Sequence, residues 1–249
     1  MLLPFIAAAL AHQPFVVGDD PSSSDSAFVV EEPEVSIVVY AEPTCDASEV
    51  WLTLDAAPGD EIFFQLGIPV ADSLEDWRPR IALVAPGLPD ADVGFPLPEG
   101  TGALVYTPEG EPQRFDEPFS GTSSWILVEE RVVLPEGGPA WLVAFQPDGT
   151  VARLWVAVGD IERFDQDDWE RIADLMDDVR AFHGIDDSGV PAPLTCPVDD
   201  AGDAGDNGAG DGADSDAASK GCAVAPIAPG MTLLGLALAA LALRRRGVR

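Results

Sequence analysis

The feature that most constrains the fold is a series of short apolar runs between residues 27 and 160, separated by Pro, Gly and Asp. Within one run, Val50, Leu52 and Leu54 take every second position, which is the period of a strand with one buried face. We therefore predict eight or nine strands, at Val35–Tyr40, Val50–Leu54, Glu61–Leu66, Arg80–Val84, Ala103–Tyr106, Ser124–Leu127, Arg131–Leu134, Ala140–Phe145 and Val151–Val158.

The connections between these runs define the fold class. No helical pattern alternates with the strands, so we predict an all-β domain over residues 27–198, an antiparallel β-sandwich of the jelly-roll or immunoglobulin-like kind. The turn sequence Gln146–Thr150 contains Pro147, which presets one dihedral angle, and Gly149, which tolerates a positive one. This turn predicts that the last two strands form a hairpin.

One helix is predicted after the strands, over residues 166–183. Asp165 is a good N-cap, and Gly184 is a good stop signal at the other end. Apolar residues recur at spacings of three and four, which predicts a stripe that packs against the sandwich. The stripe comprises Trp169, Ile172, Ala173, Met176, Val179 and Phe182.

The charge of the chain limits its partners. The formal net charge is −31, and five of the 13 basic residues lie at or after Lys220. The region before Lys220 thus holds 8 basic and 44 acidic residues, a net charge of −36. Such a surface repels nucleic acid phosphates and anionic lipid headgroups, so we expect neither as a partner.

The first residues are typical of an export signal. Residues 1–11, MLLPFIAAALA, are apolar and end in the small-x-small pattern that signal peptidase recognises. Cleavage after this segment would make His12 the mature N-terminus. We expect residues 12–26 to form a flexible segment before the domain, because they are rich in Gly, Asp, Pro and Ser.

The last residues predict a membrane anchor. The 21 residues from Ala223 to Leu243 carry no charge, and as a helix they would span about 30 Å, the thickness of the bilayer core. Arg244, Arg245 and Arg246 follow directly. The positive-inside rule places this cluster in the cytoplasm and the acidic region on the exported side.

The order of residues in this tail, 221–249, is characteristic. Gly221-Cys222, the apolar helix and the arginine cluster resemble the MYXO-CTERM sorting tail of myxobacterial surface proteins. The resemblance implies recognition by a sorting protease of the rhombosortase type, cleavage near Cys222 and transfer of the body from the inner membrane to the outer surface. Lys220 departs from the second Cys of many such tails. The alternative is a plain single-span anchor.

Between the body and the tail, residues 199–220 contain mainly Asp, Gly and Ala. No large apolar residue is available for packing, so we predict a disordered stalk. The many Asp residues raise the alternative of calcium binding, but they lack the EF-hand spacing.

Three cysteines are present in a chain that we expect to be exported. If Cys222 belongs to the tail, Cys45 and Cys196 remain, and an oxidising compartment favours a disulfide between them. Two free thiols are the alternative.

Few residues indicate chemistry. His12, as a mature N-terminus, would offer its amine and an imidazole nitrogen to copper, as in histidine-brace proteins, and His183 would supply a third nitrogen. Alternatively, His183 is a surface residue stabilised by the helix dipole. No common catalytic motif is evident, and carboxylates are too abundant to single out a hydrolase pair.

The stretch from Arg114 to Trp125 is the least ordinary part of the body. Together with Ile81–Pro89 it resembles a motif pair in uncharacterised secreted β-sandwich proteins. Arg114, Phe119 and Trp125 would suit a glycan-binding surface, and the alternative places both aromatic residues in the core. The sequence thus predicts an exported, surface-anchored, non-enzymatic module for envelope, adhesion or ligand-binding roles, with glycans or surface proteins as partners. A copper protein and a hydrolase are the alternatives.

Overall fold

The structure is a computed structural model that describes residues 12–185 and 188–197. The predicted signal peptide (1–11), stalk (199–220) and sorting tail with Gly221, Cys222, Arg244, Arg245 and Arg246 lie outside the described residues. Within the described part of the chain, no helix is long and apolar enough to cross a membrane.

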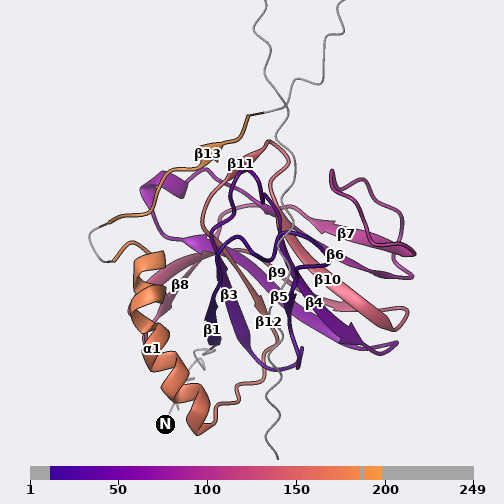
Figure 1. Cartoon of the computed structure of the whole chain (residues 1–249), viewed down its shortest axis with the longest axis horizontal. Helices are drawn as coiled ribbons and strands as arrows, with labels where there is room; N and C mark the ends of the chain where they lie inside the picture. The colour runs from indigo at the N-terminus through magenta and orange to yellow at the C-terminus, as the bar shows by residue number, and fades with distance from the viewer. Residues whose placement is uncertain (1–11, 186–187, 198–249) are drawn as a thin grey trace, which may run out of the picture. The chain divides into compact units, whose positions relative to one another are not determined.

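Two β-sheets pack face to face, with α1 on the outside of one of them (Figure 1). The six-stranded sheet has the order β1 (Gln13–Val16), β3 (Ile37–Ala41), β12 (Leu154–Val158), β5 (Glu61–Pro69), β9 (Thr122–Val133), β8 (Gln113–Glu117). The five-stranded sheet has the order β2 (Phe28–Val29), β4 (Val50–Ala56), β10 (Gly138–Phe145), β6 (Arg80–Pro86), β7 (Thr101–Tyr106). A short 3-10 helix, η1 (Asp72–Leu74), lies between β5 and β6.

The main core lies between the two sheets and follows from residue alternation along the strands. In β5, Ile62, Phe64 and Leu66 face this core, and Phe64 and Leu66 have no exposed surface. In β4, Leu52 and Leu54 meet them from the other sheet. The sandwich-like architecture predicted from the period-two pattern is therefore present.

Both sheets are mixed, so the antiparallel prediction is wrong at one edge of each. β1 pairs in parallel with β3, and β2 pairs in parallel with β4. Parallel neighbours need a crossover connection, and residues 17–36 provide it by leaving one sheet, forming β2 in the other, and returning to β3. Residues 12–26, predicted to be a flexible segment, thus contain an edge strand of the sandwich.

The predicted hairpin at Gln146–Thr150 is also wrong. The turn is present, with Gly149 at a φ of 71°, but β10 before it and β12 after it belong to different sheets. The turn sequence therefore determines a change of direction, while the pairing partners are determined by the packing of the whole domain.

The predicted helix is confirmed as α1 (Gln166–Phe182). The Asp165 carboxylate accepts the N–H of Asp168, and the Asp168 carboxylate accepts the N–H of Asp165, which completes a capping box. Ile172, Val179 and Phe182 are buried, whereas Ala173 of the predicted stripe is exposed. The helix covers the outer face of the six-stranded sheet, on the side of β1, β3 and β8 in Figure 1.

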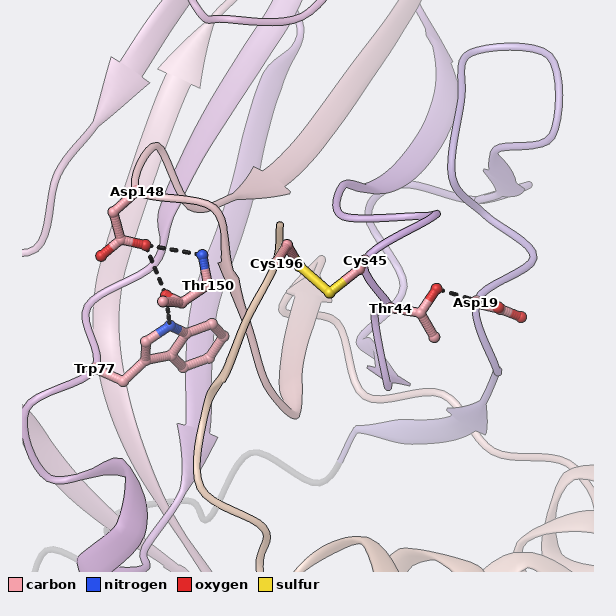
Figure 2. The surroundings of a disulfide bond; sticks show 7 residues. All are labelled: Asp19, Thr44, Cys45, Trp77, Asp148, Thr150 and Cys196. Carbon is pink, nitrogen blue, oxygen red and sulfur yellow. Dashed lines mark hydrogen bonds between the residues drawn. A yellow bond between two sulfur atoms is a disulfide. The ribbon is translucent and has the colours of Figure 1, made fainter. Parts of the chain in front are cut away.

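The predicted disulfide is confirmed: Cys45 and Cys196 are joined, with 5.2 Å between their Cα atoms (Figure 2). Next to it, β13 (Leu194–Thr195) pairs with β11 (Thr150–Val151). Thr150 also accepts the indole N–H of Trp77 at 3.0 Å, as Figure 2 shows. A bridge across so long a loop is expected to contribute about 4–5 kcal/mol to stability.

Candidate functional site

The candidate site is a pocket of about 430 Å³ between α1 and the outer face of the six-stranded sheet. Residues of both edge strands line it, Pro14 of β1 on one side and Phe115 and Glu117 of β8 on the other. Because the two edges border one cavity, the twisted sheet curves around it and α1 closes only part of the opening. Its aromatic lining consists of Tyr40, Phe115, Phe119, Trp155, Phe164 and Trp169.

The floor of the pocket depends on a glycine in β5. Trp155 of β12 lies across Gly67, where an added Cβ would be 2.1 Å from Cζ2 of the indole. Opposite Gly67, β9 carries a bulge, since Leu66 pairs with Val128 and Gly67 pairs with Ile126. Only glycine allows the indole to lie this close to the backbone. The indole and Ile126 therefore form a flat apolar floor.

Three aromatic rings gather at the mouth of the pocket. Phe164 stacks on Trp169, with 4.9 Å between the ring centroids and 27° between the planes. Phe119, from the turn between β8 and β9, approaches Trp169 at 5.7 Å. The residues Phe119 and Trp169 are 57% and 46% exposed. Aromatic rings held in place while exposed are typical of a binding surface.

Two carboxylates line the pocket at different places. Glu117 accepts the N–H of Phe119 at 2.9 Å, and burial raises its pKa, with Glu162 acting in the same direction and the Phe119 N–H opposing. Glu129 accepts a hydrogen bond from the buried Gln65 at 2.6 Å. Glu117 lies opposite Thr122, so at about 3.3 Å per residue the two glutamates are about 20 Å apart along β9. This separation is too large for a glycosidase pair.

A buried polar network joins the floor to the end of α1. The Nδ1 of His183 bonds the carbonyl of Val179 at 2.8 Å, and its Nε2 lies 3.0 Å from the Ser124 hydroxyl. Since a carbonyl only accepts, Nδ1 carries the proton, and Ser124 donates to Nε2. The indole of Trp155 donates to the same hydroxyl at 3.1 Å. Every hydrogen-bonding atom of the imidazole is therefore used.

The contact between Ser124 and His183 resembles a nucleophile and its base, but its electrostatics favour a structural role. Burial lowers the pKa of His183 to about 4, while the Val179 carbonyl opposes this and Arg153 adds to it. An imidazole with so low a pKa is a weak base near pH 7. The network therefore fixes the C-terminal end of α1 above the floor rather than activating the hydroxyl.

The two candidate copper ligands are not brought together. His12 lines the pocket, and its Nδ1 lies 2.6 Å from the Ser36 hydroxyl; burial lowers its pKa to about 4, and Glu162 opposes this. The next residue, Gln13, bonds Asp168 in the first turn of α1, whereas His183 caps the last turn. At about 1.5 Å per residue these ends are about 22 Å apart. In residues 12–185 and 188–197, no cluster of three or more His, Cys, Asp or Glu could hold a metal ion.

The three predicted ligand-binding residues divide between two surfaces. Phe119 lines the pocket, whereas Arg114 pairs with Asp116 at 3.0 Å and lies over the ring of Trp125 at 5.8 Å. Trp125 is half-buried against the core between the sheets. Phe119 is thus exposed, as the prediction of a binding surface requires, whereas Trp125 packs against the core, as the alternative prediction requires. Glu117 and Phe164, which sequence reasoning missed, accompany Phe119 at the mouth.

Comparison with known proteins gives little further information. No protein-family model matches the chain, and no curated protein matches it. Among solved structures, it is similar to the pre-peptidase C-terminal domain of collagenase from Bacillus anthracis. The TM-score is 0.29 and the identity 7%, over 53% of this chain and 92% of that chain. A likeness this distant says nothing about function.

Proposed function

We propose that the protein is a non-enzymatic ligand-binding module, exported and anchored at the cell surface, whose ligand occupies the pocket under α1. The pocket carries this proposal. Its volume of about 430 Å³ lies in the range of small-molecule sites, and aromatic side chains line it while polar groups stand at defined places. The cores between the sheets and on the other outer face are filled by buried side chains.

The proposal of display at the surface rests on the sequence. The apolar residues 1–11, the apolar run at 223–243 and the arginines at 244–246 support export followed by anchoring. The resemblance of the tail to MYXO-CTERM supports processing by a rhombosortase-type protease near Cys222. A Cys222→Ala variant should then remain in the inner membrane, and unchanged surface display on fractionation would contradict the sorting role.

The binding role is tested by filling the pocket. The full chain, purified after export, is screened by thermal shift against glycans and amphiphilic small molecules, and hits are titrated by calorimetry. Met176→Trp enlarges a half-buried side chain that lines the pocket, so it should abolish binding of the hits.

Ala173→Trp is the matched control, because it adds an indole at an exposed position of α1 outside the pocket lining. Binding should survive in this variant. A screen without hits, or hits that bind equally to Met176→Trp, would contradict the proposed site.

A further inference from the structure

The charged side chains that line the pocket are all acidic. Among the described residues that line it, Glu117 and Glu129 are acidic and none is Lys or Arg. His12 is neutral near pH 7, because burial lowers its pKa to about 4. Arg180 lies beside the pocket, but it bonds the backbone carbonyl of Ser120 and pairs with Asp177. An anionic ligand would therefore meet repulsion from Glu117 and Glu129 without a compensating Lys or Arg side chain in the lining.

The two acidic positions differ in their surroundings. The Glu129 carboxylate accepts a hydrogen bond from the side-chain amide of Gln65. Glu117 lies two residues from Phe119, and its carboxylate accepts the backbone N–H of Phe119. Tyr40, which also lines the pocket, is near enough that Glu117 raises its pKa, after burial as the larger cause. Negative charge thus concentrates at the mouth.

The aromatic rings at the mouth add to this preference. Phe119 and Phe164 each contact Trp169 there, and the face of an aromatic ring carries partial negative charge that attracts cations. Burial and Glu162 also make the charged form of Glu117 less favourable, as its raised pKa shows. A cation placed between the carboxylate and the rings would offset both effects.

Away from the mouth, parts of the floor and of the roof of the pocket are apolar. Ile126 and Trp155 form its floor, and Ile172 and Met176 of α1 form its roof. These side chains match a hydrocarbon or other apolar group, and they provide no hydrogen bonds for the hydroxyl groups of a sugar. The mouth of the pocket therefore favours a cationic group, and the space between floor and roof favours an apolar group of the same ligand.

We propose that the pocket binds a cationic amphiphile, with an ammonium head between Glu117 and the rings of Phe119 and Trp169 and an apolar part between Ile126 and Met176. This inference rests on the proposed ligand-binding function and names its ligand class. It requires that binding strength follow the charge of the head when the apolar part is kept constant.

The first test uses three probes with one decyl chain, all below their micelle concentrations. They are decyltrimethylammonium, decanol and decanoate, titrated into the full chain by calorimetry at pH 7. We expect the ammonium probe to bind about tenfold more tightly than decanol, and decanoate to bind most weakly. Equal binding of ammonium and alcohol, or preference for decanoate, would overturn the inference but leave a ligand-binding pocket. No binding of any probe would count against the proposed function as well.

The second test removes the charge at the mouth. In Glu117→Gln the amide oxygen can still accept the N–H of Phe119, so the turn is retained, and the preference for ammonium over decanol should disappear. Asp174→Asn is the matched control, since it removes one carboxylate from the exposed face of α1; it should keep the preference. Circular dichroism checks that both variants fold. Loss of the preference in Asp174→Asn, or its retention in Glu117→Gln, would assign the effect to overall charge and contradict the site.

Discussion

The outer faces of the two sheets are covered in different ways. On the five-stranded sheet, residues 87–100 cover Trp51, Val143 and Phe145, and Phe95 of this loop contacts both aromatic rings at 5.2 and 5.1 Å. On the six-stranded sheet, α1 covers Tyr40 and Trp155 but leaves the pocket. We call them the closed face and the open face.

The difference between the two faces shows how the element that covers a sheet can leave a pocket beneath it. The closed-face loop lies against the sheet backbone, so that a Cβ on Gly102 would be 2.2 Å from the carbonyl oxygen of Leu88. The capped helix α1 is instead held at both ends, by Gln13 near its start and by Ser124 at His183. A straight helix over a curved sheet cannot touch every strand. The space beneath it is the pocket.

The largest expected effect comes from removing a phenylalanine ring on each face. Phe145→Ala on the closed face should cost about 3–5 kcal/mol in unfolding free energy, because it creates a cavity in a filled core. Phe115→Ala on the open face should cost about 1–2 kcal/mol, since that ring is half-buried and already borders the pocket. Urea unfolding of both variants measures the difference. Equal costs would show that the open face is packed as tightly as the closed face.

A smaller difference is expected from adding a methyl group under each cover. Gly102→Ala should destabilise by about 2–3 kcal/mol, because the methyl group meets backbone on the closed face. Gly67→Ala should cost less, about 1–2 kcal/mol, because its nearest contact is the indole of Trp155, which can move into the pocket, and backbone lies farther away, with the Trp125 carbonyl oxygen at 2.7 Å. Trp155 fluorescence should change only in the second variant. A greater loss from Gly67→Ala than from Gly102→Ala in urea unfolding would contradict the looser packing of the open face.

The open face should also make stability depend on pH. His183 is neutral in the folded protein, with a pKa of about 4 against 6.5 for an unperturbed histidine. Between these values the unfolded chain binds more protons, so stability falls as the pH falls from about 6.5 to about 4. One histidine contributes up to about 1.4 kcal/mol per pH unit.

His183→Gln should therefore weaken the dependence of unfolding free energy on pH within this window. Phe145→Leu, a closed-face variant, lowers stability without removing a titratable group and should retain the slope. Identical slopes in the wild type and His183→Gln, measured by urea unfolding at several pH values, would mean that His183 does not stay neutral in the fold.

The smallest expected change in stability is at the mouth of the pocket. Phe119→Ala should alter the unfolding free energy by about 0.5 kcal/mol or less, because the ring is largely exposed. Affinity for the pocket ligand should nevertheless fall in calorimetry. A large loss of stability would instead show that Phe119 serves the fold.

Several elements could be predicted from the sequence because their signals are local. The capping residue Asp165 and the stop at Gly184 delimit α1, and alternation marks the buried strands such as β4. The disulfide could be predicted from the number of cysteines, since only Cys45 and Cys196 remain once Cys222 is assigned to the tail.

The remaining elements depend on contacts between distant residues. β8 has the sequence QRFDE, with a single apolar residue, and becomes a strand through its pairing with β9. β1 pairs in parallel with β3, and this pairing forms only after the chain has crossed to the other sheet and returned. The pocket unites Pro14, Phe115 and Met176 from three elements. The pocket exists because the six-stranded sheet curves, and no local sequence pattern predicts that curvature.

The disulfide has a mechanical consequence. Residues 46–195 form a loop closed by the bond between Cys45 and Cys196. A pulling force applied to the chain beyond residue 197 enters at Cys196 and passes through the sulfur atoms to Cys45. It does not stretch the backbone of β13 or α1, both of which lie inside the loop. The part of the pocket that α1, β8 and β9 form thus stays off the path of the force, whereas β1 and β3, which precede Cys45, do not.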